Sequence, residues 1–261
     1  MVNDNMKPAE GNMIGMCRAI HVPQVVSVLP KAFVEYSFLP NFSDTNAYIY
    51  STPALGARFL EYELEMQPGG KTKQAMSNEM EHFLFVIDGG VEMTLDGTKY
   101  DMDKGGYAWV PPNTPLALNN KSGGVSRTLW LRKRYEKVPE WAIPDPVISN
   151  EKDVPAIQMD AEIEQRLLPF EKNQGFDLAM NILSFKPGVT FGRAEYHVFE
   201  HGAFFLNGRG TFWINGKHYE VHVDDFVYFY AFVPHYVGAY GPESLTYILY
   251  KDVNRDYEHL I

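Results

Sequence analysis

Short apolar runs, separated by Gly, Pro, Asn and Asp, recur along most of the chain. Residues 57–66 (ARFLEYELEM) alternate apolar and polar side chains, which is the period of a half-buried strand. Further apolar runs follow at 82–87, 91–95 and 107–110, and Asp96-Gly97 is typical of a type I′ hairpin turn. No segment in this half of the chain has a convincing amphipathic helix period. The pattern predicts an all-β fold.

The same succession of runs and turns recurs about 120 residues later. The later apolar runs lie at 179–185, 203–206, 211–214 and 226–230. Alignment of the turns places Pro68-Gly69 against Pro187-Gly188, Gly89 against Gly208, and Asp96-Gly97 against Asn215-Gly216. A repeat of this kind indicates structural units of one design. We therefore expect two all-β domains in tandem.

The domain boundaries follow from the repeat and from composition. We expect residues 46–135 to form the N-terminal domain and residues 159–261 the C-terminal domain. Residues 136–158 are rich in proline and charge, which favours a linker. Residues 1–45 are expected to form an N-terminal arm that packs on the domains and wraps onto the first repeat. Residues 159–168, at the end of the linker, are expected to be a short helix or a loop.

Composition and charge narrow the class of protein. The 261 residues are 45% hydrophobic and 21% charged, as in ordinary globular proteins. With 23 Lys and Arg against 33 Asp and Glu, the formal charge is −10, which disfavours nucleic-acid and anionic-membrane partners. The local basic cluster at 127–137 is expected to be a solvated face. Unpaired edge strands would favour a homo-oligomer.

Cysteine usage and targeting signals bear on the compartment. The single cysteine, Cys17, excludes an internal disulfide and fits a reducing compartment. The first residues lack the apolar core of a secretory signal, and no stretch approaches the roughly 18 apolar residues of a spanning helix. We expect a soluble, cytoplasmic protein with a small-molecule substrate.

The chemistry-bearing residues concentrate in one segment, 187–210 (PGVTFGRAEYHVFEHGAFFLNGRG). Glu195, His197 and His201 have the spacing E-x-H-x3-H, and an extended backbone would project Glu195 and His197 to the same face. His235 follows Pro234 at the start of a later run and is a fourth candidate ligand. Three imidazoles and a carboxylate suit Mn²⁺, Fe²⁺, Ni²⁺ or Zn²⁺, and the spacing does not select among them. Four ligands leave two positions of an octahedral ion open for substrate.

The N-terminal repeat lacks an equivalent ligand set. His82 aligns with His201, but the positions that align with Glu195, His197 and His235 hold Met76, Asn78 and Leu116. Methionine and leucine are not ligands for a hard divalent ion. We therefore expect no complete metal site in the N-terminal domain. The remaining histidines match no ligand spacing: His21, His218, His222 and His259.

The Pro-Gly turn, the glutamate and two histidines, and the Pro-flanked later ligand resemble the two motifs of the cupins. The glutamate-first order resembles, more narrowly, the bicupins that act as (S)-ureidoglycine aminohydrolase. The likeness spans about residues 45–257 and extends to segments outside the ligand block: 51–56 (STPALG), 105–107 (GGY), 175–177 (GFD), 181–187 and the tail 247–255 (YILYKDVNR).

The resemblance implies two tandem cupin barrels, also called double-stranded β-helices or jelly rolls. It implies Mn²⁺-dependent release of ammonia from (S)-ureidoglycine to give (S)-ureidoglycolate, a step of purine (allantoin) degradation. The positions that match the family's metal ligands are Glu195, His197, His201 and His235.

The resemblance also implies roles beyond metal ligation. Glu195 would handle a proton as well as bind the ion, and Lys251 would meet the substrate carboxylate as a compact counter-charge. Tyr247 lies four residues before Lys251, on the same strand face. It would line the pocket or pack in the core.

Two departures from the family pattern leave other functions open. His235 stands where the family commonly has glutamine, and Phe212 stands where it often has tyrosine. Three histidines and one glutamate are also the ligands of oxalate- and flavonol-oxidising cupins, so a metal oxidase or dioxygenase is the alternative enzyme class. A non-catalytic small-molecule-binding bicupin is a third possibility. The glutamate-first order and the tail favour the aminohydrolase.

Overall fold

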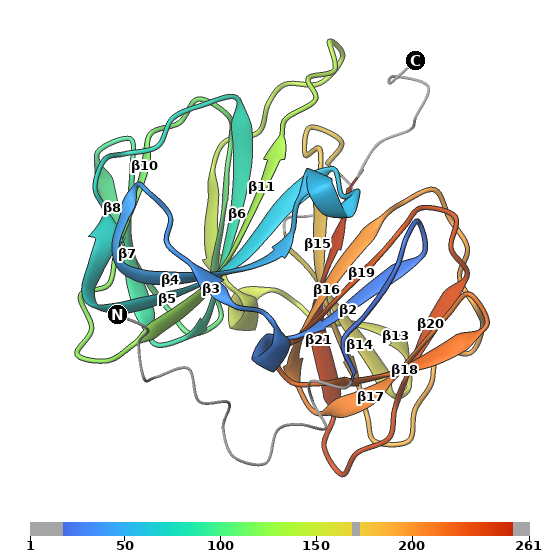
Figure 1. The fold of residues 1–261 in the computed structure, drawn as a ribbon. Helices are drawn as coiled ribbons and strands as arrows, with labels where there is room; N and C mark the ends of the chain where they lie inside the picture. The colour runs from blue at the N-terminus through green and yellow to red at the C-terminus, as the bar shows by residue number, and fades with distance from the viewer. Residues whose placement is uncertain (1–17, 169–172, 253–261) are drawn as a thin grey trace.

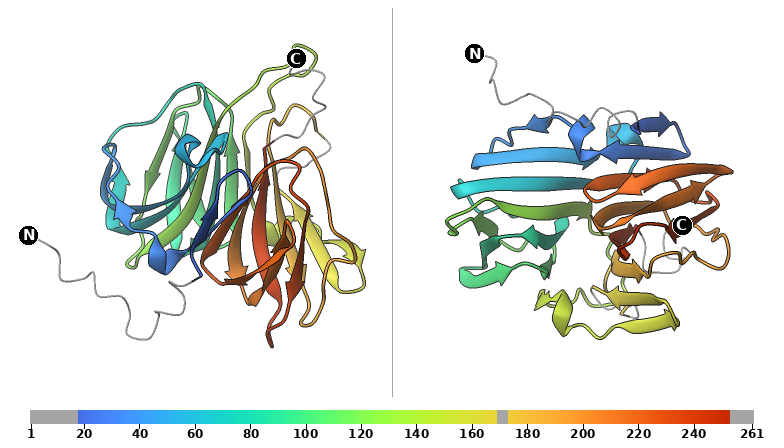
Figure 2. Two further views of the ribbon diagram at one scale, coloured as in Figure 1. Left: turned by 45° about the vertical axis from the view of Figure 1, so that its right-hand side comes forward. Right: turned by 90° about the horizontal axis from the view of Figure 1, so that it is seen from below.

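A computed structural model describes residues 18–168 and 173–252, and almost all regular structure in these residues is β-strand (Figure 1). The strands form two barrel-like halves that lie side by side (Figure 2). The prediction of an all-β fold built from two tandem barrels is confirmed. Three short 3-10 helices, at Lys31–Phe33, Pro53–Leu55 and Glu151–Asp153, interrupt the described strands. None of the described helices is long and apolar enough to cross a membrane.

The N-terminal barrel is a ten-stranded sheet in which the long strand β5 pairs with β4, with β11 and, at Lys71↔Asn119, with β10. Its strands are β3 (Tyr36–Ser37), β4 (Phe42–Ser51), β5 (Phe59–Thr72), β6 (Met80–Asp88), β7 (Gly90–Leu95), β8 (Thr98–Asp103), β9 (Gly106–Val110), β10 (Leu116–Asn119), β11 (Ser126–Arg134) and β12 (Val147–Asn150).

The C-terminal barrel is built from an eight-stranded and a three-stranded sheet. The larger sheet has the order β1 (Ile20–Val22), β2 (Val26–Pro30), β19 (Asp225–Phe229), β16 (His201–Asn207), β21 (Leu245–Lys251), β15 (Ala179–Phe185), β14 (Ile163–Leu167) and β13 (Ile157–Asp160). The smaller sheet has the order β18 (Lys217–His222), β17 (Arg209–Ile214) and β20 (His235–Ala239).

Turn geometry supports the sequence repeat. Gly69 and Gly188, aligned from the sequence, have φ of 81° and 82°. The hairpin turns at Asp96-Gly97 and Asn215-Gly216 have positive φ at both residues, as a type I′ turn requires. The two halves therefore share turn conformation as well as turn sequence.

Three apolar cores hold the molecule together. One fills the N-terminal barrel around Trp130 and Leu84, and a second fills the C-terminal barrel around Phe205 and Phe229. The third lies between the barrels and draws on strands of both, with Phe59 of β5 packed on Tyr250 of β21 at a ring-centroid distance of 4.1 Å. The strands that face this third core are consequently buried on both faces.

This packing corrects the prediction that residues 57–66 form a half-buried strand. Glu61 and Glu63 of β5 are 2% and 0% exposed, because the polar face of β5 lies against the second barrel and not against solvent. Lys31 and Arg127 pair with the Glu63 carboxylate at 2.7 Å and 2.6 Å. A period-2 pattern identifies the strand, but it does not show whether the polar face of that strand is covered by water or by another part of the protein.

The expectation that residues 127–137 form a solvated basic face is wrong for Arg127 and Lys133, although Arg134 of this cluster is exposed. Arg127 reaches across to Asp224, before β19, at 2.7 Å. Lys133 is 2% exposed and pairs with Asp177 at 2.7 Å. These cations are held by carboxylates because an unpaired buried charge would be strongly destabilising.

The N-terminal segment joins the C-terminal barrel before the chain enters the first one. β2 pairs with β19 from Val26↔Phe229 to Pro30↔Asp225, and Val26 and Val28 are fully buried there. The expectation that the arm wraps onto the first repeat is therefore wrong for this segment. β2 covers an edge of β19 that would otherwise be unpaired. Residues 1–17, including Cys17, lie outside the described residues.

The segment 159–168 is neither a helix nor a loop. β13 and β14 form a hairpin, and β14 pairs with β15 from Ile163↔Phe185 to Leu167↔Asn181. The free edge of β15 provides hydrogen-bond partners for the backbone groups of this segment. The mixed sequence of residues 159–168 does not predict this pairing. The expected linker likewise contributes β12, which pairs with β9.

We predict that Glu61 makes stability depend on pH. Its carboxyl is buried, no hydrogen bond to Oε2 is found among the described residues, and burial raises its pKa to about 8. The folded chain keeps this proton above about pH 5, where the unfolded chain has lost it. The free energy of unfolding should therefore fall as the pH rises toward about 8, by up to about 1.4 kcal/mol per pH unit.

Glu61→Gln should remove this contribution. Urea unfolding at several pH values should show a shallower slope for the variant than for wild type, with the variant more stable at pH 8. Parallel pH profiles for the two proteins would contradict the assignment.

Candidate metal centre

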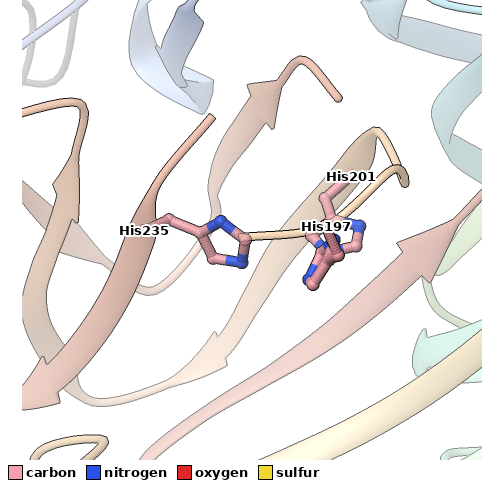
Figure 3. Close-up of side chains that lie close together, drawn as sticks. All are labelled: His197, His201 and His235. Carbon is pink, nitrogen blue, oxygen red and sulfur yellow. The ribbon is translucent and has the colours of Figure 1, made fainter. Parts of the chain in front are cut away.

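Three histidines come together at the mouth of the C-terminal barrel. His201 is the first residue of β16 and His235 the first residue of β20, while His197 lies in the irregular segment that precedes β16. Their rings face one another (Figure 3), and their candidate ligand atoms lie within 4.8 Å. Among the described residues this is the only cluster of three or more His, Cys, Asp or Glu side chains with metal-binding spacing.

Backbone carbonyls orient two of the rings. His201 Nδ1 donates to the Glu200 carbonyl at 2.7 Å, and His235 Nδ1 donates to the Val233 carbonyl at 2.8 Å. Each ring therefore carries its proton on Nδ1 and presents the lone pair of Nε2 to the centre of the cluster. A backbone partner on the outer nitrogen is the usual way in which a protein fixes a metal-binding histidine.

Burial keeps the rings neutral. Burial first, and then the charges of neighbouring groups that include the other imidazoles, lower the pKa of His197 to about 4 and that of His201 well below the usual value. Burial also lowers the pKa of His235. Neutral imidazole is the form that binds a metal ion. His197 Nε2 and His201 Nε2 lie 3.3 Å apart, an arrangement of two nitrogens that a cation between the rings would stabilise. The donor set therefore fits a divalent ion.

Glu195 lies beside this cluster but is not one of its three members. Its backbone forms an isolated bridge with His235, with N–H to O distances of 2.7 Å and 3.0 Å in the two directions. Its Oε2 is 4.0 Å from His235 Nε2, and its side chain is 36% exposed. Within the segment 194–199, Glu195 is the one residue with a β-type backbone pairing. Ligation by Glu195 stays a prediction.

A small cavity of about 30 Å³ adjoins the histidines. Its walls are mainly aromatic, and its lining includes Glu195, His201, Phe212, Phe229, His235 and Tyr247. A cavity of this size holds at most a few water molecules. The aromatic walls restrict water beside the cluster, while the half-exposed Glu195 marks its open side.

Tyr247 both lines this cavity and packs in the barrel core. Its ring lies 5.4 Å from Phe205 and 6.0 Å from Phe212, measured between centroids. Burial and then the charge of Glu195 raise the pKa of its hydroxyl, which therefore stays protonated. Tyr247 therefore both lines the pocket and packs in the core, the two roles that were expected as alternatives.

Lys251 ends β21 directly opposite His201 in the sheet register. Its Nζ lies 5.7 Å from the centroid of Phe199. Its positive charge contributes to the lowered pKa of both His197 and His201. Lys251 is thus a cation at the edge of the histidine cluster. Residues 253–255 of the tail motif lie outside the described residues.

The N-terminal barrel has the same backbone without the ligands. Met76 and Leu116 form the isolated bridge that corresponds to Glu195 and His235. His82 is 1% exposed and stacks on Trp130 at 5.9 Å, and its Nδ1 accepts a hydrogen bond from the indole N–H. Burial lowers the His82 pKa to about 3. His82 is a packed core residue.

No sequence pattern points to the residues that support the backbone of His201. The Glu200 carboxylate accepts hydrogen bonds from the Tyr228 hydroxyl at 2.7 Å and the Arg58 backbone N–H at 2.8 Å. These contacts fix the residue whose carbonyl orients His201. They join positions that are distant in sequence, so only adjacency to His201 could have drawn attention to Glu200.

Comparisons with known proteins agree with this architecture. Residues 62–132 and 181–250 match the cupin domain family. The (S)-ureidoglycine aminohydrolase of Escherichia coli (strain K12) is 33% identical over 225 residues, which cover 85% of this chain and 86% of that protein. The crystal structure of protein Ylba from E. coli has a TM-score of 0.83 at 31% identity, covering 92% of this chain and 95% of that chain.

A variant of Bacillus subtilis oxalate decarboxylase has a TM-score of 0.70 at 11% identity, covering 90% of this chain and 79% of that chain. This likeness shows a shared fold alone. The two cupin matches and the extent of the match to the E. coli aminohydrolase decide the family. The chain belongs to the bicupin family of (S)-ureidoglycine aminohydrolase.

Proposed function

We propose that the protein is a metal-dependent hydrolase that releases ammonia from (S)-ureidoglycine and forms (S)-ureidoglycolate, a step of purine degradation in the cytoplasm. The observation that carries this proposal is the convergence of three neutral imidazoles between a half-exposed carboxylate and an ammonium group. The named activity of the E. coli relative supplies the substrate.

His197, His201 and His235 would hold the ion, with Glu195 as the fourth ligand. Mn²⁺ is the expected ion, and the N/O donor set also suits Fe²⁺, Ni²⁺ or Zn²⁺. When bound, such an ion polarises substrate oxygens. The aromatic cavity beside it limits the access of bulk water.

Glu195 and Lys251 would have two further roles, proton transfer and binding of the substrate carboxylate. An amine leaving group needs a proton, and Glu195 is a carboxylate on the open side of the cluster that can take up and return one. Lys251 provides a compact positive charge for the substrate carboxylate. Its place opposite His201 in the sheet puts that charge next to the reacting centre.

The alternative enzyme is a metal oxidase or dioxygenase, which the third histidine, His235, favours. A non-catalytic small-molecule-binding bicupin is the other alternative. Oxygen separates these functions. Ammonia release from enzymatically generated ureidoglycine under argon is expected for the hydrolase, whereas oxygen uptake with oxalate or a catechol would indicate the oxidase. Metal binding without turnover of any of these compounds would indicate a binding protein.

The first prediction concerns where metal binds. His201→Ala should abolish tight binding of a divalent ion, because it removes one of three converging nitrogens. His82→Ala is the matched control in the other barrel and should keep one equivalent of ion per chain, although the loss of its contact with Trp130 should lower stability. Metal analysis of both purified variants is the measurement. Two equivalents of ion in wild type, or loss of the ion in His82→Ala, would refute a single site in the C-terminal barrel.

A second prediction separates the roles of Glu195 and Lys251. Glu195→Gln keeps an oxygen ligand but cannot carry a proton at neutral pH, so kcat should fall by about 10²–10⁴-fold even with saturating Mn²⁺. Lys251→Met removes a counter-charge and should mainly raise KM. Steady-state kinetics with metal content measured in parallel test both expectations. Recovery of full rate by metal-loaded Glu195→Gln would show that the carboxylate is only a ligand.

A further inference from the structure

One backbone turn next to the metal centre occurs in both barrels. Phe232, between β19 and β20, has a left-handed φ of 60°, and its aligned counterpart Asn113 has a φ of 61°. Phe232 N–H donates to the carbonyl of His197 at 2.8 Å, and Asn113 N–H donates to the carbonyl of Asn78 at 2.6 Å. The turn and its hydrogen bond therefore belong to the fold and are independent of metal binding.

The side chains at this turn differ in a way that the fold does not explain. Asparagine tolerates the left-handed region, whereas a bulky aromatic residue is strained there. Burial does not compensate for this strain, because Phe232 is 54% exposed. The metal-bearing repeat thus carries an unfavourable residue where the other repeat shows a favourable one.

The Phe232 side chain contacts the segment that carries two of the candidate ligands. It packs on Tyr196 with a centroid distance of 5.7 Å, and Tyr196 is itself 65% exposed. Tyr196 stands between Glu195 and His197, and its counterpart in the first barrel is Ser77. The aromatic pair therefore joins the segment of two ligand candidates to the turn that leads to His235.

His197 is the ligand with the greatest need of such support. It is outside the strands, and its buried Nδ1 has no hydrogen-bond partner among the described residues. His201 and His235, in contrast, begin strands and are each oriented by a carbonyl. The position of His197 depends on its carbonyl bond to Phe232 and on the side chains beside it.

We propose that Tyr196 and Phe232 form an aromatic clamp that positions His197 for metal binding. This inference rests on the proposed metal site. Both are positioning residues, since they act through the ligand segment and not on the substrate. Residues that orient a metal ligand commonly change metal affinity by about 10–100-fold when they are replaced.

The test uses the substitutions that the other barrel shows at the same positions. Phe232→Asn and Tyr196→Ser remove the rings, and Phe232→Asn also relieves the backbone strain while it keeps the N–H. Phe38→Asn is the control, because Phe38 is 75% exposed and packs on Tyr36 in the N-terminal barrel. The full-length chains are compared by calorimetric Mn²⁺ titration, by urea unfolding of the metal-free protein, and by hydrogen exchange of residues 195–199.

A clamp predicts opposite effects on stability and affinity. Metal-free Phe232→Asn should unfold at the same or a higher urea concentration than wild type, while its Kd for Mn²⁺ rises about tenfold and exchange at 195–199 accelerates. Tyr196→Ser should raise Kd similarly, and the double variant should be no weaker than either single variant. Phe38→Asn should leave Kd unchanged.

Three results would overturn the clamp: a Kd for Phe232→Asn within twofold of wild type, an equal rise in Phe38→Asn, or a parallel loss of stability and affinity. If wild type itself binds no divalent ion, the proposed function fails. The clamp is then judged by hydrogen exchange in the metal-free chain, where unchanged exchange at 195–199 refutes it.

Discussion

The face-to-face packing of the two barrels is the constraint on which most of the structure depends. Because β5 of one barrel lies against β16 and β21 of the other, these strands have no solvent face. At Gly202 the approach is so close that an added Cβ would lie 2.8 Å from the Phe59 ring. The same strands carry His201 and Lys251, so the interface between the barrels also fixes two of the proposed functional side chains.

The two barrels share a scaffold but differ in chemistry. The isolated bridge, the left-handed turn, and the hydrogen bond from that turn to the carbonyl of His197 or Asn78 are present in both halves. In the C-terminal half this scaffold displays Glu195, His197 and His235, and in the N-terminal half it displays Met76, Asn78 and Leu116. The fold therefore positions ligands without requiring them. A few side chains therefore distinguish the barrel that carries the proposed metal centre from the barrel that lacks its ligand set.

Much of this could be predicted from the sequence, because strands, turns and the repeat are local features. The Asp96-Gly97 turn and the alignment of His82 with His201 needed no tertiary information. The burial of Glu61 and Glu63 could not be predicted. The alternation of apolar and polar residues shows that both side chains lie on one face of β5, but it does not show what covers that face. The pairing of β2 with β19 joins segments far apart in sequence, which no local pattern encodes. β14 and β15 are consecutive strands, but the mixed sequence of β14 does not predict that it pairs. The carbonyl partners of His201 and His235 are only one and two residues away, but the sequence does not show that the folded backbone turns these carbonyls toward the rings.

We expect His197, His201 and His235 to hold one metal ion per chain. Anomalous diffraction from crystals of the Mn²⁺-loaded protein, recorded on both sides of the manganese edge, tests it most directly. We expect one anomalous peak per chain, within coordination distance of all three imidazoles, and no peak beside His82. A peak in the N-terminal barrel, or none among the three histidines of the loaded protein, would contradict it.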